Sequence, residues 1–431
     1  MINKPRAWAT IFATRDAHRS FVETCLERSY PAPLEVTVCA PNRGSANHSC
    51  TCDRDNRSRL VANEAKPCER HFIFEPLAET RHWSRIHSLD IVFISPPGEY
   101  KVPLVLGSCR FFKMPSLRLT HLKWTDLGTP HAEHLFLVPP FVSTLRSLSF
   151  HGFWDGRLIE LNNLTSFTLW GSCGDIDAES FRAFILNNQS LETLSLETVW
   201  FEGGSGGHPV ILPNLKSLHL SWTQEILSTL FLAPALKRLS SLSIFPLVER
   251  DESQLTLRAT GEGITFTANE DFSNILRVWQ DVINPAKPTI QHVRLGNPDD
   301  RELFDNVDRS AVLPLLKDVH TLEIGRGYAP DFYPELWANL REFGPQLRTI
   351  RFEVQEETEP LQGIDEEYEC WGGDLLNHIE ELVAYRSGQG RPFSTVERMV
   401  VSESEWVNRQ QEFVWRCFYN DRRLDRYLQP Q

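Results

Sequence analysis

A short pattern of apolar residues recurs along most of the chain and restricts the folds that it can adopt. An apolar residue is followed three and five positions later by two more, as at Leu145, Leu148 and Phe150. The last two lie two positions apart, so both point to the same face of a β-strand. One such strand cannot bury its apolar face alone, whereas stacked neighbours can. The pattern therefore predicts an array of similar strands.

Eleven copies of the pattern lie between residues 84 and 402. From Leu122 to Leu242 the central apolar positions are separated by 26, 19, 27, 24 and 24 residues, which brackets the length of a leucine-rich repeat, about 20–29 residues. The wider gap between Leu242 and Val293 predicts a degenerate unit around Ile264/Phe266. The copies are Ile86/Leu89/Ile91, Leu119/Leu122/Trp124, Leu145/Leu148/Phe150, Leu164/Phe167/Leu169, Leu191/Leu194/Leu196, Leu215/Leu218/Leu220, Leu239/Leu242/Ile244, Ile290/Val293/Leu295, Val319/Leu322/Ile324, Leu347/Ile350/Phe352 and Val396/Met399/Val401.

The segments between the copies carry apolar residues at helical spacing. In the segment from Asp177 to Leu186, for example, Phe181, Phe184 and Ile185 share one side of a helix, and Asp175 or Asp177 can cap its N-terminus. Strands that alternate with helices imply a parallel sheet with right-handed crossovers. We therefore expect an α/β fold, a leucine-rich-repeat-like solenoid with a parallel strand face and helices on the opposite side. The other expected helices are Glu225 to Leu232, Phe272 to Val282, Pro334 to Phe343 and Leu375 to Tyr385.

The repeats divide the chain into four parts. Residues 1–40 are expected to hold short helices and a strand, and residues 41–83 a polar loop that leads into the array. The solenoid is expected at 84–402, with an acidic insert near 354–370. Residues 403–431 are expected to form a C-terminal capping helix, because an end repeat must shield its open core.

Composition narrows the classes of partner and compartment. The net charge of −13 argues against nucleic acid as the main partner. Residues 297–385 hold 21 acidic and 7 basic residues, which suits either a solvated face or a surface for a basic partner segment. No stretch approaches the roughly 20 apolar residues of a membrane helix, so no membrane is expected. Nine scattered cysteines, an odd number, indicate reduced thiols and a cytoplasmic or nuclear protein.

Three segments bear a partial likeness to catalytic or cofactor motifs. A loop with metal-like residue types does not have the spacing of a standard zinc finger. The glycine run at 203–207 lacks the Lys-Ser/Thr of a phosphate loop. The acids at 365–369 lack the spaced ligands and central Gly of an EF-hand. We therefore expect no cofactor, no metal and no enzymatic activity. The metal-like residues are His48, Cys50, Cys52, Cys68 and His71.

The strand face that does not point into the core offers the candidate contacts. Residues that flank the central apolar position point outward, and in the early copies they are mostly Ser and Thr. A large aromatic residue such as Trp170 on an open sheet face is costly to solvate and typical of binding hot spots. The later copies place charged side chains there instead. The candidate partner-binding residues are His151, Trp170, Glu197, His219, Phe245, Arg294, Glu323 and Arg351.

The N-terminus resembles a known family. Residues 5–11, with Pro5, Trp8 and Ile11, look like the closing segment of an F-box, and residues 21–36 resemble the segment after the box in many fungal F-box/leucine-rich-repeat proteins. We expect the F-box itself to be truncated or missing before Pro5. In that family the F-box docks on the adaptor Skp1 of a cullin-based ubiquitin ligase, and the repeats hold the substrate. The resemblance thus implies that Pro5, Trp8 and Ile11 are an adaptor-side remnant.

These observations lead to one expected function and one alternative. The first is a non-catalytic protein-recognition subunit that resembles a substrate receptor of a Skp1–cullin–F-box ubiquitin ligase and holds an unknown protein on its strand face. Skp1 would be a partner if an F-box is present upstream. The alternative is a stand-alone leucine-rich-repeat scaffold without ligase coupling.

Overall fold

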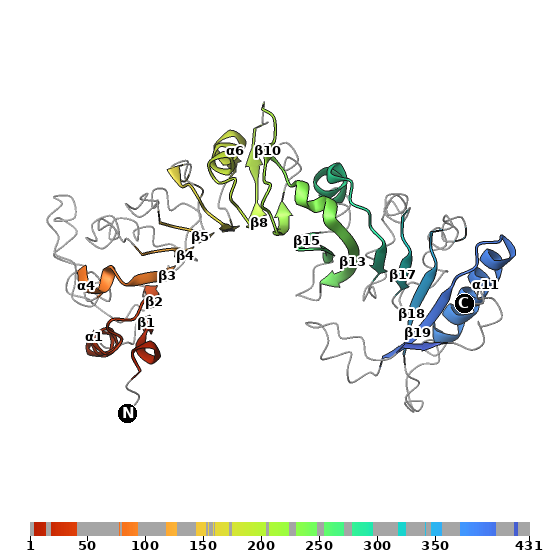
Figure 1. The fold of residues 1–431 in the computed structure, drawn as a ribbon, viewed down its shortest axis with the longest axis horizontal. Helices are drawn as coiled ribbons and strands as arrows, with labels where there is room; N and C mark the ends of the chain where they lie inside the picture. The colour runs from red at the N-terminus through yellow and green to blue at the C-terminus, as the bar shows by residue number, and fades with distance from the viewer. Residues whose placement is uncertain are drawn as a thin grey trace, which may run out of the picture. The chain divides into compact units, whose positions relative to one another are not determined.

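The chain forms two compact units, Met1–Ala233 (unit 1) and Pro234–Gln431 (unit 2). Both come from a computed structural model. In the part of the chain that it describes, the fold is mixed α/β, with a mostly parallel sheet and few helices (Figure 1). The described residues are 4–13, 19–40, 77, 80–93, 118–126, 144–151, 154, 158, 160–171, 175–203, 207–223, 230–247, 254–270, 278–295, 318–324, 341, 346–355, 371–401 and 418–420.

Unit 1 is built on strands that pair in parallel with their neighbours in chain order. The order is β1-β2-β3-β4-β5-β6-β8-β11. Two short parallel pairs, β7 with β9 and β10 with β12, form separate two-stranded sheets in this unit. The bounds are β1 Thr10–Ala13, β2 Leu34–Ala40, β3 Ile86–Phe93, β4 His121–Asp126, β5 Ser147–His151, β6 Ser166–Trp170, β7 Ile176–Asp177, β8 Thr193–Val199, β9 Phe201–Glu202, β10 Val210–Ile211, β11 Ser217–Thr223 and β12 Phe231–Leu232.

The apolar positions of the repeated pattern form the core of this sheet. In all eleven copies the last two apolar residues lie in a strand, as predicted. In unit 1 they align across neighbouring strands, so that Leu122 pairs in register with Leu148, and Leu148 with Phe167. All three of these side chains are buried. Burying a side chain of this size stabilises the fold by about 1.5–3 kcal/mol, so the stacked rows account for the strand positions.

A repeated backbone contact joins each strand to the next. The carbonyl of Thr120 accepts hydrogen bonds from two successive amides, those of Arg146 and Ser147, at 2.8 and 2.9 Å. The carbonyl of Arg146 accepts in the same way from Thr165 and Ser166. The turns before the strands therefore share one geometry in both units. The same double contact recurs at the carbonyls of Thr165, Glu192, Gln291, His320 and Arg348.

Helix α6 (Ala178–Asn187) covers the inner side of β6 through aromatic side chains. Its first residue follows Asp177, whose carboxylate accepts the Ser180 amide at 2.8 Å, as predicted for the N-cap. Phe184 packs on Phe167 with ring centroids 4.5 Å apart, and Trp154 contacts both rings. The expected helix from Asp177 to Leu186 is therefore confirmed. The other helices that the structure describes in unit 1 are η1 Pro5–Trp8, α1 Arg19–Arg28 and α4 Thr80–Trp83.

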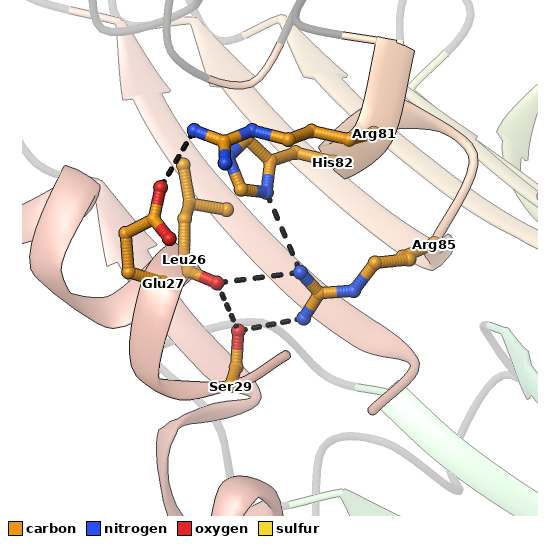
Figure 2. Close-up of polar contacts among 6 residues, drawn as sticks. All are labelled: Leu26, Glu27, Ser29, Arg81, His82 and Arg85. Atoms are coloured by element: carbon orange, nitrogen blue, oxygen red, sulfur yellow. Dashed lines mark hydrogen bonds and ion pairs between the residues drawn. The ribbon is translucent and has the colours of Figure 1, made fainter. Parts of the chain in front are cut away.

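A buried arginine closes the C-terminal end of α1 (Figure 2). Arg85 follows α4 and directly precedes β3. Its Nε donates to the Ala32 carbonyl at 2.9 Å, and its Nη1 to the Leu26 carbonyl at 3.3 Å. Its Nη2 donates to Ser29 Oγ at 2.7 Å, and Nη1 lies 3.4 Å from His82 Nδ1. The last carbonyls of a helix lack partners within the helix, and a cation suits the negative end of the helix dipole. Arg85 supplies both a hydrogen-bond donor for the Leu26 carbonyl and a positive charge at this end of α1.

Unit 2 combines parallel strands with an antiparallel hairpin. Strands β13, β16, β17, β18 and β19 pair in parallel. Strands β14 and β15 form the hairpin, and β14 also pairs antiparallel with β13. The bounds are β13 Leu239–Leu247, β14 Gln254–Gly261, β15 Ile264–Glu270, β16 His292–Leu295, β17 Thr321–Ile324, β18 Thr349–Gln355, β19 Thr395–Val401 and β20 Phe418–Asn420, with helical segments η6 Pro234–Arg238, η7 Trp279–Ile283, η8 Asn284–Ala286 and α11 Trp371–Gly388.

Helix α11 confirms the helix predicted from Leu375 to Tyr385 and extends it at both ends. Near its C-terminal end, buried Arg386 donates from Nη2 to the Leu347 carbonyl at 3.1 Å. The same guanidinium lies 4.9 Å from the ring centroid of Phe393, within the roughly 6 Å of a cation–π contact. Leu347 and Phe393 precede β18 and β19, so this arginine joins the helix to the turns of two neighbouring strands.

Four expectations need correction. The region around Ile264 and Phe266 is not a degenerate repeat but one strand of the β14–β15 hairpin, because Leu257, Ala259, Ile264 and Phe266 alternate with polar residues at the two-residue period of a strand. The predicted helix from Glu225 to Leu232 ends in the strand β12, and its residues 225–229 lie outside the described residues.

The two ends of the array also differ from the prediction. Residues 1–40 were expected to hold one strand, whereas they hold β1 and β2, which pair in parallel with each other, and β2 also pairs with β3. In the expected capping helix at 403–431, the described residues 418–420 form β20, which pairs antiparallel with β19. A strand can satisfy the free backbone groups of an edge strand, which a helix packed on the core cannot. The acidic insert near 354–370 lies almost wholly outside the described residues.

The other predicted helices are described only in part. Of the segment from Phe272 to Val282, the described end forms the π-helical turn η7. Of the segment from Pro334 to Phe343, only Arg341 is described, and it is helical. No helix in the described residues is long and apolar enough to cross a membrane.

Candidate functional site on the outward strand face

The outward side chains of unit 1 align in rows across the sheet. Thr168 on β6 pairs in register with Ser149 on β5 and with Ser195 on β8. His219 on β11 continues this row beyond Ser195. This row, in the middle of β6, is thus made of small hydroxyl residues and a histidine. The sequence placed these residues on one face, and the register agrees with that placement.

Four of the predicted contact residues lie next to one another on β5, β6, β8 and β11. His151 stacks on Trp170 with ring centroids 4.3 Å apart. Trp170 pairs in register with Glu197 on β8. Glu197 Oε1 lies 3.8 Å from His219 Nε2 and accepts the Ser195 hydroxyl at 3.0 Å. We name the set His151, Trp170, Glu197 and His219 the aromatic–acidic cluster.

Gly171 gives His151 the space that it occupies. Its φ of +63° favours glycine, and a Cβ at this position would lie 2.5 Å from His151 Nε2. The Gly171 amide also donates to the Glu197 carbonyl at 2.8 Å, which fixes the end of β6 against β8. A larger residue at 171 would therefore displace the ring that packs on Trp170. The sequence pattern did not indicate this role.

The charge state of the aromatic–acidic cluster at neutral pH follows from its surroundings. Burial lowers the pKa of His219, and the nearby Glu197 carboxylate raises it by less, so the net shift is downward. Since an unperturbed histidine titrates near pH 6.5, the His219 imidazole is neutral at pH 7. The Glu197 carboxylate therefore has an uncharged imidazole as its neighbour.

In unit 2 three predicted contact residues come together around one carboxylate. The side chain of Glu323 on β17 is only 5% exposed and lies 2.8 Å from Arg351 Nη1 on β18. Arg294 Nε on β16 lies 3.9 Å away, and His292 Nε2 lies 3.0 Å away. We name Glu323, Arg294, Arg351 and His292 the buried-glutamate cluster. The sequence predicted ionic contacts to a partner here, and the structure shows these side chains in contact with each other. His292 belongs to the cluster because it lies two positions before Arg294 and therefore on the same face of β16.

The electrostatics of the buried-glutamate cluster favour its ionised form. Burial alone would raise the pKa of Glu323. Hydrogen bonds from His292 and Arg351, together with the positive charge nearby, outweigh this effect and lower the pKa below its ordinary value. The carboxylate is therefore charged at neutral pH, and it holds the two arginines on the outward face.

The remaining predicted residues divide between packing and the undescribed part of the chain. Ile11 lies in β1 and is 1% exposed, so it belongs to the core rather than to a docking surface. Trp8 and Pro5 are half-buried in η1, and the Arg28 guanidinium lies 4.7 Å from the Trp8 ring centroid. The backbone of Phe245 pairs with Thr256 in the β13–β14 ladder, and its side chain lies outside the described residues.

The part of the chain that the structure describes contains no metal-ligand cluster. Among those residues, no group of three or more His, Cys, Asp or Glu side chains is placed to hold a metal ion. The metal-like set His48, Cys50, Cys52, Cys68 and His71 lies outside them.

The strand face can therefore present an exposed indole, a carboxylate and hydroxyl groups in unit 1, and a net positive cluster in unit 2. Such side chains bind other molecules by stacking, ion pairing and hydrogen bonding. Comparison of the chain with protein-family models finds no match, and comparison with curated proteins finds no significant match.

Proposed function

We propose that this chain is a non-catalytic protein-recognition subunit that holds a protein partner on the outward face of its parallel strands. The observation that carries the proposal is Trp170, a residue that is 44% exposed on that face between His151 and Glu197. Large aromatic residues that remain exposed on a rigid sheet are typical anchors of protein interfaces. In this proposal the chain works in the cytoplasm or the nucleus, and nucleic acid is not its partner.

The proposal includes a leucine-rich-repeat-like solenoid as the architecture of the parallel part. Two features support it: the period of the apolar pattern and the shared double hydrogen bond at the turns before the strands. A hydroxyl recurs at the same place as well. Thr144 Oγ1 donates to the Leu119 carbonyl at 2.9 Å, and Ser190 Oγ donates to the Leu164 carbonyl at 2.8 Å. Repeats that contact their neighbours in one geometry are what a solenoid requires.

The coupling to a ubiquitin ligase is a separate part of the proposal. It is supported by the resemblance of residues 5–11 to the end of an F-box, and it makes Skp1 a partner if an F-box is present upstream. The alternative is a stand-alone scaffold that uses the same strand face without Skp1. Burial of Ile11 in β1 favours the alternative at that one position, because a core side chain cannot also dock on an adaptor.

The recognition function can be tested by site-specific photo-crosslinking in the native cell. A photoreactive amino acid replaces Trp170 on the strand face, and in a matched chain it replaces Leu186, which is 52% exposed on α6. We expect a defined protein adduct from position 170 and none from position 186. Adducts of equal yield from both positions, or none from position 170, would refute recognition on this face.

The ligase coupling can be tested by co-purification with Skp1. The unaltered chain is compared with a Pro5→Ala/Trp8→Ala variant and with a control variant, Phe12→Ala, whose side chain is exposed on β1. Ligase coupling predicts that Skp1 and cullin co-purify with the unaltered chain and the control and are lost from the double variant. If Skp1 never co-purifies while position 170 still yields its adduct, the stand-alone scaffold is the better description.

A further inference from the structure

Trp170 and Glu197 lie directly opposite each other on neighbouring parallel strands, β6 and β8. We propose that this pair binds the guanidinium group of an arginine side chain in the partner. The inference rests on the proposed recognition function and specifies the chemistry of the partner segment, which would be a basic segment that carries an arginine. The indole, the carboxylate and the separation between them each favour this ligand.

The indole offers a face for a flat cation. His151 packs on Trp170 from the β5 side, and Glu197 stands on the opposite, β8 side, because β6 lies between these strands. The exposed part of the indole can thus receive a planar group beside Glu197. A guanidinium over the face of Trp is attracted by the ring and also stacks on it, which an ammonium does not do.

The carboxylate offers an uncompensated negative charge. Among the described residues, no Lys or Arg lies within ion-pair distance of Glu197, whose side chain is 34% exposed. Its neighbours there are the Ser195 hydroxyl and the imidazole of His219. Burial lowers the pKa of His219, so the imidazole is uncharged at pH 7 and does not neutralise Glu197.

Two other carboxylates in unit 1 show the contrast. Asp90 lies 3.7 Å from Lys123, and Glu192 lies 2.8 Å from Lys216. Each of these acids already faces a cation from this chain, whereas Glu197 faces none within the described residues. A cation supplied by a partner should therefore form a more favourable ion pair with Glu197 than with Asp90 or Glu192.

The separation of the two groups matches the size of the ligand. Neighbouring strands lie about 4.8 Å apart. A guanidinium that donates to a carboxylate at about 2.8 Å can at the same time lie over a ring on the next strand. The Ser195 hydroxyl holds Glu197 Oε1, and a carboxylate accepts several hydrogen bonds, so Glu197 can take the forked donors of an arginine as well. The net charge of −13 would also attract a basic segment.

The test uses the full chain labelled with 5-fluorotryptophan and followed by fluorine NMR. The signal of Trp170 is assigned as the one that disappears in a Trp170→Phe variant. N-acetyl-arginine methylamide is titrated into the protein at pH 7, and the neutral isostere N-acetyl-citrulline methylamide and N-acetyl-lysine methylamide are titrated in parallel. We expect a saturable shift of the Trp170 signal with the arginine probe, and at least about tenfold weaker binding of the other two, a factor equivalent to 1.4 kcal/mol.

Two matched variants locate the charge that the arginine contacts. Glu197→Gln should weaken binding of the arginine probe at least about tenfold, whereas Glu192→Gln, at the turn before the same strand, should leave it unchanged. Equal binding of citrulline or lysine by the unaltered protein would overturn the proposal, and this comparison needs no variant to fold. Equal losses in the two variants would overturn it too.

Failure of this inference can be told apart from failure of the recognition function. If the arginine probe does not shift the Trp170 signal but the photoreactive residue at 170 still captures a defined protein, the strand face binds a partner by other chemistry and the arginine site is refuted. If the probe binds as expected but no adduct forms at 170, the arginine site stands and protein recognition on this face is refuted.

Discussion

Buried polar side chains lie in or near several of the turns that lead from a helix into a strand. Arg85 precedes β3, Asn188 follows α6, and Arg386 lies near the end of α11. Each is at most 4% exposed, and each donates to backbone carbonyls in its surroundings. A buried carbonyl without a partner costs about 1–3 kcal/mol. These side chains thus supply hydrogen-bond donors to backbone carbonyls at these positions and stabilise the turns.

Replacement of Arg85 by alanine should destabilise unit 1 by about 3 kcal/mol, because the Leu26 and Ala32 carbonyls and Ser29 Oγ lose their donor. Arg81→Ala is a matched control four residues earlier. Its ion pair with Glu27, at 2.6 Å (Figure 2), joins two side chains that are each more than half exposed, and such pairs contribute about 0–1 kcal/mol. Urea unfolding of the two variants gives the comparison. Equal losses would show that the buried contacts of Arg85 contribute nothing beyond a surface ion pair.

Glu323 should make the stability of unit 2 depend on pH. Because its pKa is lowered in the folded state, its contribution is fully present above the pKa of an unfolded glutamate, about 4.3. That contribution is lost as the pH falls through the lowered folded value. Glu323→Gln should therefore cost about 3 kcal/mol at pH 7, because two largely buried arginines lose their carboxylate, and much less at pH 3.

Denaturant unfolding of the Glu323→Gln variant at the two pH values measures this difference. Glu262→Gln, an exposed change in the β14–β15 turn, is the control and should alter stability by less than about 0.5 kcal/mol at either pH. A Glu323→Gln cost that is the same at pH 3 and pH 7 would contradict the charged cluster.

At the scale of elements, Asn188 connects α6 to the turn before β6. Its Nδ2 donates to the Phe184 carbonyl at 2.8 Å and to the Leu161 carbonyl at 2.9 Å, and its Oδ1 accepts the Leu164 amide at 3.0 Å. One side chain therefore ends the helix and fixes the turn before β6. The position of α6 over the aromatic core depends on this connection.

Asn188→Ala should destabilise unit 1 by about 3 kcal/mol, since three buried backbone groups lose their partner. The neighbouring exposed Gln189→Ala is the control and should cost less than about 0.5 kcal/mol. Thermal unfolding followed by circular dichroism compares the two. A loss no larger for Asn188 than for Gln189 would show that the turn relaxes to satisfy its own backbone.

The strands could be predicted from the sequence because their signal is local. Paired apolar residues such as Leu148 and Phe150 require a common face, and nothing in their surroundings overrides that requirement. The hairpin was missed because its apolar residues were compared only with the repeat pattern. The segment from Leu255 to Phe266 does contain a strand-like alternation interrupted by Gly-Glu-Gly, a signal typical of a hairpin.

The site could be predicted only in part for a different reason. Alternation along a strand shows that Trp170 and Glu323 lie outward, and the register agrees. It does not show which charges meet, because Arg294, Glu323 and Arg351 are far apart in sequence and their distances depend on the stacking of three strands. The roles of Arg85 and Gly171 depend on neighbours from other elements, and a single sequence carries no mark of these contacts.

At the scale of the whole molecule, each of the two units contains buried apolar side chains. Phe167 on β6 is fully buried in unit 1, and Phe352 on β18 is fully buried in unit 2. In an array of stacked strands each element depends mainly on its neighbours. A defect in one core is therefore expected to have local effects.

Phe167→Ala, which should cost about 3–5 kcal/mol, is expected to increase amide hydrogen exchange in β4 to β8 and to leave β16 to β18 unchanged. Phe352→Ala is the converse variant, and we expect it to increase exchange in β16 to β19 only. Each variant serves as the control for the other. Hydrogen exchange measured by mass spectrometry on both proteins decides the point. Increases throughout the chain in both variants would mean that the two units unfold as one.

The β14–β15 hairpin has a consequence for the order in which unit 2 folds. Its strands are joined by the two residues Glu262 and Gly263, and a hairpin of this kind closes in about 1–10 μs. Each parallel pairing must first bring together segments separated by a crossover, at a greater entropic cost. The hairpin should therefore be the first part of unit 2 to form, giving β13 an edge on which to align before β16 and β17 add in turn.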